Sequence, residues 1–445
     1  MSDRLIRVDR FADLNAADKA ALFAHSSLDI SAVKSQVIEP LAAKFRAGSM
    51  AALANAAREF EGFLPEKLIL TRDDLKAAHD RVASAQGETL AAFTRAAQNI
   101  AAFHEKQKQS GFETEIAGNT LGVKFIPFDR VALYVPGGKA LYPSTVLMGT
   151  LPARIAGVAD ILLMTPPDPE LKKVSDIVLA MAYVAGVTRV LQAGGAQAIF
   201  AAAYGIPELG IEPVDFIFGP GNIYVSAAKI HAAGENLCGI DSFAGPSEVV
   251  IIADDSANPR YVAHDLMAQA EHDENAQAIL ITTSAALAEK TAGEILASLA
   301  KRDDDEKRKK ITLEAIRRNG RVLLVDSLDE AAAISNRYAP EHLEIQTREN
   351  DAVLAKIRAA GSVFVGDYAP VAAGDYYSGT NHILPTMGGA RFTSGVSVYS
   401  FYRRMTWQKL TRAGLEAAKD AISLMSKAEG LFAEHGYSVL TRFED

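Results

Sequence analysis

The chain has 445 residues, of which 49% are hydrophobic and 23% are charged, so it can bury a substantial core and has the composition of an ordinary globular protein. The formal net charge of -9 at pH 7 argues against binding to nucleic acid or to an anionic membrane, because both need a basic face. Cys238 is the only cysteine, which excludes an intrachain disulfide and a cysteine-ligated zinc site. The N-terminus lacks the apolar core of a signal peptide, and no apolar run reaches about 18 residues, so we expect a cytoplasmic protein without a membrane span.

The first part of the chain, to about residue 110, is predicted to be helical, because alanine is abundant and apolar residues recur at a spacing near 3.6, as in SMAALANAAREFEGF. Strands and helices then alternate over residues 130–240, where DILLMTPP, for example, is followed by VSDIVLAMAYVAGV. A second alternating unit begins at EVVIIAD and ends at SVFVGD, and the C-terminal segment is again predicted to be helical. This alternation predicts an α/β fold with two doubly wound parallel sheets between helical ends.

Gln269 and His272 stand three residues apart in MAQAEHDENAQ, on a predicted helix, and would therefore share one face. A polar pair of this kind at a helix end can supply two ligands to one metal ion. The alternative is a solvated helix end with no ligand.

Glu341 and His342 are adjacent in RYAPEHLEI, after a proline and at the start of a predicted strand. Neighbours on a strand point to opposite faces, but at the end of a strand both can reach a cleft. A glutamate beside a histidine can serve as a general acid and base. The alternative for these two residues is a surface turn.

Asp375 lies in GDYYSGTNHILPT, after the strand-like run GSVFVGDY, where α/β folds place ligand-binding groups. Its carboxylate is a suitable ligand for zinc or manganese. With Gln269 and His272 it would leave a mixed nitrogen and oxygen site one nitrogen short, and His435 in GLFAEHGYS could supply that ligand.

Three glycine-containing loops each lie between a predicted strand and a predicted helix, and they read YVPGGKALYPST, QAGGAQAI and FGPGNIYV. Backbone N–H groups at a helix start favour phosphate, so three such loops in one unit favour a nucleotide or phosphate ligand. None of them matches GxGxxG, the usual dinucleotide motif, and the alternative for each is a simple tight turn.

Taken together, these stretches resemble one family, the histidinol dehydrogenases. The resemblance is carried, in chain order, by LYVPGGKALYPSTVLM, GGAQAIFAAAYG, GPGNIYVSAAK, GIDSFAGPSEVVIIAD, AQAEHD, APEHLE, GSVFVGDY, GDYYSGTNHILPT and AEGLFAEH. It extends from about residue 130 to the C-terminus and is highly specific, whereas the N-terminal helices match more in character than in letters.

The resemblance implies a zinc-dependent, NAD-linked enzyme that oxidises a primary alcohol to an aldehyde and then to a carboxylate. It also implies a homodimer with shared active sites, built from two incomplete Rossmann-like domains. The expected organisation is an N-terminal helical arm (residues 1–30), a first domain (residues 31–133 and 247–396), a second, NAD-binding domain (residues 134–246) and a C-terminal helical tail that contacts the partner subunit (residues 397–445).

The resemblance also implies roles for single residues. Glu341 and His342 would be the catalytic pair, in which His342 takes the alcohol proton and Glu341 activates water against the aldehyde. His382 would orient Asp375 or Glu341 without binding the metal. The residues expected to contact NAD, one from each glycine loop, are Tyr134, Gln197 and Asn222.

The zinc ligands implied by the resemblance are Gln269, His272, Asp375 and, from the partner subunit, His435. The amino alcohol substrate would contact these ligands and His342. Two further substrate contacts are implied, Ser247 and, again from the partner subunit, Glu429.

The sequence departs from the family pattern at the expected substrate pocket. Val371 follows Pro370 where the family usually has a glutamate of the cationic pocket, and losing one charge-assisted hydrogen bond there would cost about 1.5–3 kcal/mol. The C-terminal motif has one extra residue, so either Glu434 or His435 takes the ligand position. We choose His435 from its spacing to Val439.

Three functions are therefore compared. The first is NAD-dependent oxidation of L-histidinol to L-histidine through histidinaldehyde in a zinc site, as a step of histidine biosynthesis. The second keeps this chemistry on another small polar alcohol, with Val371 marking an altered pocket. The third, a non-catalytic metal- or nucleotide-binding protein, is disfavoured by Glu341 and His342, since binding alone needs no base. We expect neither a nucleic-acid nor a membrane partner.

Overall fold

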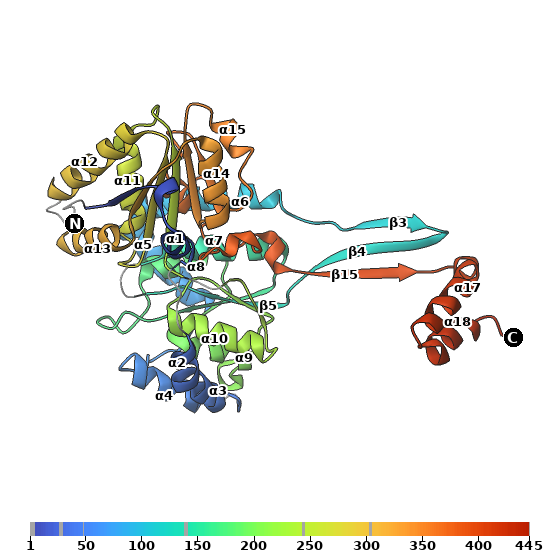
Figure 1. Cartoon of the computed structure of the whole chain (residues 1–445). Coiled ribbons are helices and arrows are strands. Elements are labelled where there is room, and N and C mark those ends of the chain that lie inside the picture. Colours follow the sequence, from blue (N-terminus) through green and yellow to red (C-terminus); the bar gives the residue numbers. More distant parts are fainter. Residues whose placement is uncertain are drawn as a thin grey trace. The chain divides into compact units, whose positions relative to one another are not determined.

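The structure is a computed structural model that describes residues 5–25, 30–47, 49–137, 141–242, 245–301 and 305–444 (Figure 1). The chain forms two compact units. Unit 1 comprises Met1–Gln107 and Asp129–Phe401, and unit 2 comprises Lys108–Phe128 and Tyr402–Asp445. Strands and helices alternate in unit 1 and build two largely parallel sheets, so the predicted α/β fold is confirmed.

The first sheet of unit 1 has six parallel strands. Their spatial order is β1 (Arg7–Arg10), β12 (Arg321–Leu324), β11 (Gln277–Thr282), β10 (Glu248–Ala253), β13 (His342–Gln346) and β14 (Ser362–Val365). From β10 the chain moves outward through β11 and β12 and then returns to the other side of β10 for β13 and β14. The strand order therefore reverses between β10 and β13, as in a doubly wound sheet.

Helices cover both faces of the first sheet. They are α11 (Pro259–Ala270), α12 (Ala285–Lys301), α13 (Glu306–Asn319), α14 (Leu328–Tyr338), α15 (Asn350–Leu354) and α16 (Val371–Tyr376). Val249 and Ile251 of β10 pack into a core with α11 and α12, whereas Val250 and Ile252 pack into a second core with α14. Alternate side chains of one strand thus enter two cores, which explains why EVVIIA is apolar throughout.

The second sheet also has six strands, of which all but the first run parallel. Their order is β2 (Ile69–Leu70), β7 (Arg189–Gln192), β6 (Asp160–Thr165), β5 (Arg130–Tyr134), β8 (Phe216–Phe218) and β9 (Gly239–Ile240). Its helices are α7 (Pro143–Ala156), α8 (Asp176–Ala185), α9 (Gly195–Tyr204) and α10 (Ile223–Gly234). The strand order of this sheet reverses between β5 and β8.

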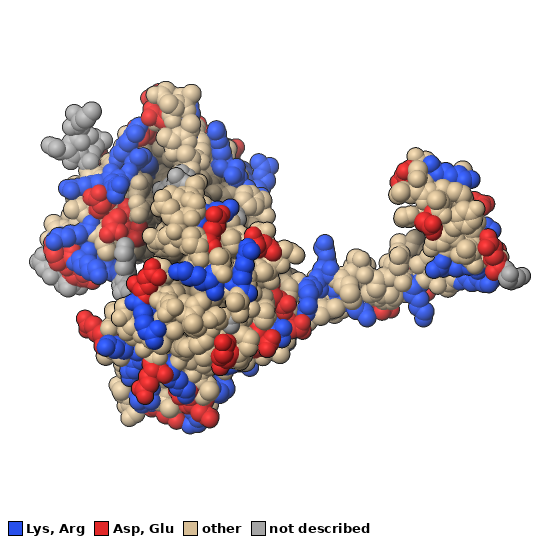
Figure 2. Space-filling model, turned by 90° about the horizontal axis from the view of Figure 1, so that it is seen from below, with Lys and Arg blue, Asp and Glu red and all other residues tan. Residues whose placement is uncertain are grey.

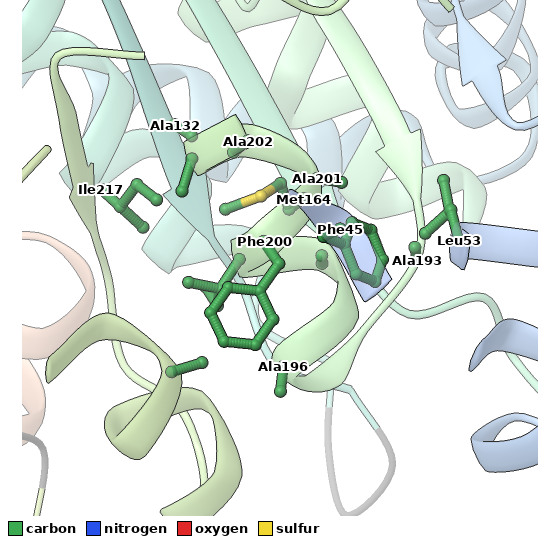
Figure 3. Packing of buried hydrophobic residues seen from close by; sticks show 14 of the residues in the cluster. Phe45, Leu53, Ala132, Met164, Ala193, Ala196, Phe200, Ala201, Ala202 and Ile217 are labelled. Carbon is green, nitrogen blue, oxygen red and sulfur yellow. The ribbon is translucent and has the colours of Figure 1, made fainter. Parts of the chain in front are cut away.

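N-terminal helices complete the core of the second sheet. Phe45, at the end of α3 (Glu39–Phe45), packs against Phe200 of α9 with ring centroids 6.1 Å apart, and Leu53 of α4 (Met50–Phe60) joins the same cluster (Figure 3). Farther along, α5 (Arg72–Ala85) contacts α8, and α6 (Gly87–Glu105) contacts α7. Residues 31–133 were expected in the first domain, but these helices pack with helices of the second sheet. The alanines of α9 allow α3 and α4 to approach closely.

The N-terminal segment differs from the expected helical arm. RVDR forms β1, which pairs in parallel with β12 at the edge of the first sheet. Its strand conformation is set by a partner near the other end of the chain, so no local pattern predicts it. The short elements that follow are η1 (Phe11–Asp13), α1 (Ala16–Phe23), α2 (Ser31–Val33) and η2 (Lys34–Ile38), and later ones are η3 (Pro207–Leu209), η4 (Gly389–Arg391) and η5 (Val398–Phe401).

Unit 2 contains a three-stranded antiparallel sheet in which β4 (Asn119–Pro127) lies between β15 (Tyr402–Lys409) and β3 (Phe112–Ile116). Ala117 and Gly118 join β3 to β4 with φ of 50° and 74°, as a two-residue hairpin turn requires. The remaining elements are α17 (Arg412–Ala428), η6 (Phe432–Gly436) and α18 (Tyr437–Leu440). The sequence analysis missed this hairpin and predicted helix at residues 402–409. Pairing with the distant β4 makes that segment a strand.

Acidic and basic side chains are interspersed on the face of the molecule that Figure 2 shows. Within the part of the chain that the structure describes, no helix combines the length and the apolar character that crossing a membrane requires.

Candidate active site

Glu341 and His342 are both buried, with 7% and 5% of their surface exposed. They lie at the junction between the end of α14 and the start of β13. Ala339 ends the helix in the left-handed region with φ of 54°, and Pro340 precedes the pair. Glu341 Oε2 lies 3.5 Å from His342 Nδ1. The surface turn considered as the alternative is therefore excluded, and the pair occupies the interior at the amino end of β13.

The main chain of Glu248, the first residue of β10, contacts both members of this pair. Its N–H donates to Glu341 Oε2 at 2.9 Å, and its carbonyl oxygen lies 3.1 Å from His342 Nδ1. Because a carbonyl can only accept, Nδ1 carries a proton and Nε2 keeps its lone pair in the neutral ring. Among the described residues Nε2 makes no hydrogen bond of normal length, and Asp375 Oδ1 lies 3.7 Å away from it. In its neutral form, His342 thus presents one basic nitrogen, Nε2.

Asp375 lies near the end of α16, and its carboxylate faces His342. It was expected directly after a strand, but β14 ends at Val365 and α16 intervenes. His382 Nδ1 lies 2.8 Å from the carbonyl oxygen of Asp375, and its Nε2 lies 3.0 Å from the Thr145 hydroxyl on α7. His382 therefore contacts the main chain of Asp375, not its carboxylate, and ties this loop to a helix of the second sheet.

Gln269 and His272 straddle the end of α11 rather than sharing a helix face, because the helix ends at Ala270. Gln269 is only 1% exposed, and neither its Oε1 nor its Nε2 has a hydrogen-bond partner among the residues described. His272 is exposed and close enough for its charge to act on Asp375. The solvated helix end considered above thus describes His272 but not Gln269.

These residues fit a metal ion. A buried amide with two unpaired atoms costs free energy unless a ligand satisfies it. An amide oxygen, an imidazole and a carboxylate form the mixed nitrogen and oxygen donor set that zinc accepts. Within the described ranges, no three His, Cys, Asp or Glu side chains come together as a metal site by themselves, so the fit depends on Gln269.

The charges around His342 favour its protonated form. Burial lowers the pKa of His342, but Glu341 and Asp375 outweigh burial and raise this pKa well above its ordinary value. Burial raises the pKa of Asp375, but the imidazoles of His342, His382 and His272 together lower it. Burial lowers the pKa of His382. His342 is therefore a stronger base than His382.

The three residues expected at the cofactor lie around the carboxyl ends of strands in the second sheet. Tyr134 ends β5, Gln197 lies in the first turn of α9, and Asn222 caps α10 by accepting the N–H of Tyr224 at 3.0 Å. The Tyr134 hydroxyl accepts the N–H of Gly195 at 3.0 Å. Because strand order reverses between β5 and β8, Tyr134 and Asn222 flank the place where doubly wound sheets bind ligands.

The second and third glycine loops are packed so closely that side chains would not fit at some of their glycines. A Cβ on Gly219, whose φ is 105°, would lie 2.2 Å from the carbonyl oxygen of Tyr134. Glu61 Oε1 accepts the N–H of Gly194 at 2.7 Å and the amide of Gln197 at 3.1 Å. The tight turns considered as alternatives are therefore real. Residues 138–140 of the first glycine loop lie outside the described residues.

The remaining predicted residues are placed as follows. Ser247 is half-buried and directly precedes Glu248. Glu429 and His435 are exposed residues of unit 2, the first at the end of α17 and the second within η6. Glu434 is His435's neighbour in η6, so the choice between these two as a ligand stays a prediction.

Val371 begins α16, and its side chain is buried in the apolar core of the first sheet. Its N–H donates to Glu344 Oε1 at 3.0 Å. Glu344 lies on the same face of β13 as His342. The side-chain amide of Gln346 donates to Glu344 Oε2 at 2.9 Å and to Asp265 of α11 at 3.1 Å. A buried carboxylate thus lies at the amide of Val371, although Val371 itself offers no polar side chain.

Glu248 and Glu344 were not among the site residues expected from the sequence. The available signal was an acidic residue in a strand segment, at the start of EVVIIA and in the middle of HLEIQ. Acidic residues are rarely fully buried, so an acid at such a position marks a polar contact.

The family model described as histidinol dehydrogenase matches residues 24–443. Histidinol dehydrogenase of Leptospira biflexa is 43% identical over 430 residues, which cover 97% of this chain and 97% of that protein. Histidinol dehydrogenase of Leptospira interrogans is 47% identical over 351 residues, 79% of this chain and 81% of that protein. The crystal structure of histidinol dehydrogenase from Elizabethkingia anophelis is 35% identical, covers 100% of this chain and 99% of its own, and superposes with a TM-score of 0.90. The chain therefore belongs to the histidinol dehydrogenase family.

Proposed function

We propose that the protein is a zinc- and NAD-dependent oxidoreductase of the cytoplasm that converts L-histidinol to L-histidine through histidinaldehyde, as a step of histidine biosynthesis. The observation that supports this best is the buried pair of Glu341 and His342, in which the contact of Nδ1 with Glu248 leaves Nε2 free as a base. A protein that only binds a metal or a nucleotide needs no such base. The shared name of the relatives adds support.

The chain's own residues divide the proton transfers between them. When bound, NAD would accept a hydride in each oxidation and zinc would orient the substrate. His342 Nε2 takes the proton of the substrate hydroxyl group as the carbinol carbon loses hydride. Glu341 has Oε2 engaged by the N–H of Glu248, so Oε1 is the oxygen that takes a proton from the water adding to the aldehyde. The resulting hydrate anion loses the second hydride and becomes the carboxylic acid, which releases a proton to water and becomes the carboxylate.

Zinc, the substrate and NAD would each be held by a separate set of residues. Gln269, His272 and Asp375 would bind zinc, together with His435 of the partner subunit. Ser247 and Glu429 of the partner subunit would contact the substrate. The residues assigned to NAD are Tyr134, Gln197 and Asn222, at the reversal point of the second sheet.

A homodimer is part of this proposal. Unit 2 exposes large apolar side chains on α17 and beyond it, with Leu424 at 68% and Met425 at 65% exposure. Leu431 and Tyr437 are also exposed. Grouped exposed apolar residues of this kind mark an interface, and a second copy of this chain is the partner that the shared-site proposal requires.

A second candidate keeps the same chemistry on another small polar alcohol. Val371 is the observation that favours it, because an apolar side chain in the core cannot hydrogen-bond a substrate amine. Glu344, which accepts the N–H of Val371, keeps a carboxylate nearby but in a fully buried place.

The first test is NADH formation from L-histidinol with zinc present, beside a panel of small polar alcohols. Two NADH per histidinol at a good rate are expected. Turnover of another alcohol in the absence of histidinol turnover would overturn the first substrate and favour the second candidate. Removing zinc with a chelator should abolish turnover, and unchanged turnover would refute the assignment of a catalytic metal.

Two variants test the residue roles. His342→Asn should slow the first oxidation by orders of magnitude, and a near-normal rate would place the base elsewhere. For the shared site, a His342 variant chain is mixed with a His435 variant chain. Restored activity in the mixed dimer is expected, and its absence would count against a site built from two subunits.

A further inference from the structure

We propose that His25 and Glu248 form a positioning pair, in which the N-terminal segment fixes the main chain that holds Glu341 and His342. This inference rests on the proposed function, because it assigns a role to residues behind the same catalytic pair. It concerns residues of unit 1 alone.

Glu248 is the residue through which any such effect must pass. It is fully buried, and its N–H and carbonyl oxygen are the groups that contact Glu341 and His342 at 2.9 and 3.1 Å. One N–H and one carbonyl of the same residue thus set the direction of a carboxylate and the tautomer of an imidazole. A rotation of the chain at the start of β10 would disturb both together.

The side chain of Glu248 anchors that stretch of chain. Its Oε1 lies 2.8 Å from His25 Nδ1 and accepts the N–H of Met387 at 3.1 Å. Burial raises the pKa of Glu248, and His25 opposes that rise. A buried polar contact is a weak source of stability compared with apolar packing, so the contribution that stands out here is geometric.

The His25 ring fits closely between Tyr338, the last residue of α14, and Gly388. The His25 ring lies 4.4 Å from the ring of Tyr338, between centroids, and the Tyr338 hydroxyl is held by Gln277 at 2.8 Å. A Cβ on Gly388 would approach His25 Nε2 to 2.9 Å, so this glycine leaves just enough room for the imidazole.

Backbone strain collects around the same pair. Of the described non-glycine residues, six have positive φ, and three of these lie at this cluster: His25 at 52°, Ala339 at 54° and Met387 at 54°. His25 and Met387 are the two residues that bond the Glu248 carboxylate, and Ala339 lies two residues before Glu341. Strained conformations persist only where surrounding contacts over-determine them, and they gather at functional sites.

The test uses full-length protein and two variants that keep the shape of the cluster. His25→Phe keeps a ring against Tyr338 but removes Nδ1, and Glu248→Leu removes the anchoring carboxylate. Both should lower kcat by about 10- to 100-fold, as loss of a supporting contact typically does, while KM and the Kd for NAD change far less. Glu248→Gln, which keeps an acceptor for Met387, should lose less than Glu248→Leu. His79→Ala, at a half-buried histidine of α5 that pairs with Asp80, is the control and should leave kcat unchanged.

A second readout separates this proposal from the proposed function. In protein with ¹⁵N-labelled histidine, the ring nitrogens of His342 report its tautomer at alkaline pH without any substrate. The wild type should hold its proton on Nδ1, and both shape-keeping variants should show a mixture of tautomers. An unchanged tautomer with unchanged kcat, or a loss confined to KM, would overturn the positioning role. Wild-type protein that shows the Nδ1 tautomer but oxidises no alcohol would refute the proposed function and leave the positioning pair standing.

Discussion

Gln269 offers the sharpest test of the metal site, because its burial can be tested without any turnover. The side chain is 1% exposed, and its two amide atoms have no partner among the described residues. Leaving one buried polar atom unpaired costs about 1–3 kcal/mol. Methionine has nearly the same length and volume as glutamine but needs no hydrogen bond. In the metal-free protein, Gln269→Met should therefore raise the free energy of unfolding by about 1–3 kcal/mol.

Zinc should act in the opposite direction, by stabilising the wild type more than the Gln269→Met variant. A ligand that binds only the folded state at 100 times its Kd stabilises by about 2.7 kcal/mol, and the wild type should gain this increment while the variant loses most of it. The assay is urea unfolding of chelator-treated protein with and without added zinc. It should be followed by circular dichroism, because Trp407, the single tryptophan, lies in unit 2 and would report that unit instead.

Gln192 supplies a matched control. It is also buried, but its Oε1 accepts the N–H of Val174 at 2.8 Å and its Nε2 donates to the carbonyl of Lys67 at 2.7 Å. Gln192→Met leaves both of these partners unpaired, so it should destabilise the protein with or without zinc. The reasoning is refuted if Gln269→Met weakens the metal-free protein as Gln192→Met does, or if zinc stabilises the Gln269 variant as much as the wild type.

Three further changes test the electrostatics of unit 1 by urea unfolding. Asp241→Asn breaks a buried ion pair with Lys229 and should lower the free energy of unfolding by about 3–5 kcal/mol. Arg81→Ala removes an exposed ion pair with Asp176 and should lower it by less than about 1 kcal/mol. Equal losses of stability in the two variants would contradict the expected effect of burial. Burial raises the pKa of Glu344 well above its ordinary value and also raises that of Asp265, so the folded state keeps protons that the unfolded chain releases. The resulting stability should be full below the ordinary carboxyl pKa of about 4.3 and should fall as pH rises toward the raised value. Glu344→Gln should flatten this fall, and a wild-type stability that rises over the same range would contradict the direction.

The folded chain explains where the side chain of Val371 lies. In the sequence, Val371 replaces the glutamate that the family usually has in the substrate pocket. In the structure the Val371 side chain fills the core beside the first sheet, while its N–H contacts Glu344. The panel of alcohols therefore tests whether the pocket accepts L-histidinol although Val371 offers it no polar side chain.

Local sequence patterns were sufficient to predict the alternation of strands and helices, the residue types of the site and the family resemblance. These are local properties: apolar runs of strand length, glycines at tight turns, and short motifs such as APEHLE that carry their own chemistry. The alternation was enough to predict the α/β class, and the motifs were enough to identify the catalytic pair as candidates. The site assignments themselves await the experiments above.

Features that depend on partners distant in the sequence become visible in the folded chain alone. RVDR and YRRMTWQK become strands because β12 and β4 offer them free edges, although neither segment has a local strand pattern. The helices α3 and α4 join the core of the second sheet because the small side chains of α9 allow them to approach closely. Glu248 acts on Glu341 and His342 through its N–H and carbonyl, groups that nearly every residue has and that no letter of the sequence distinguishes. Which backbone groups meet a catalytic side chain is fixed by the packing of strands, and so it can be read only from the folded chain.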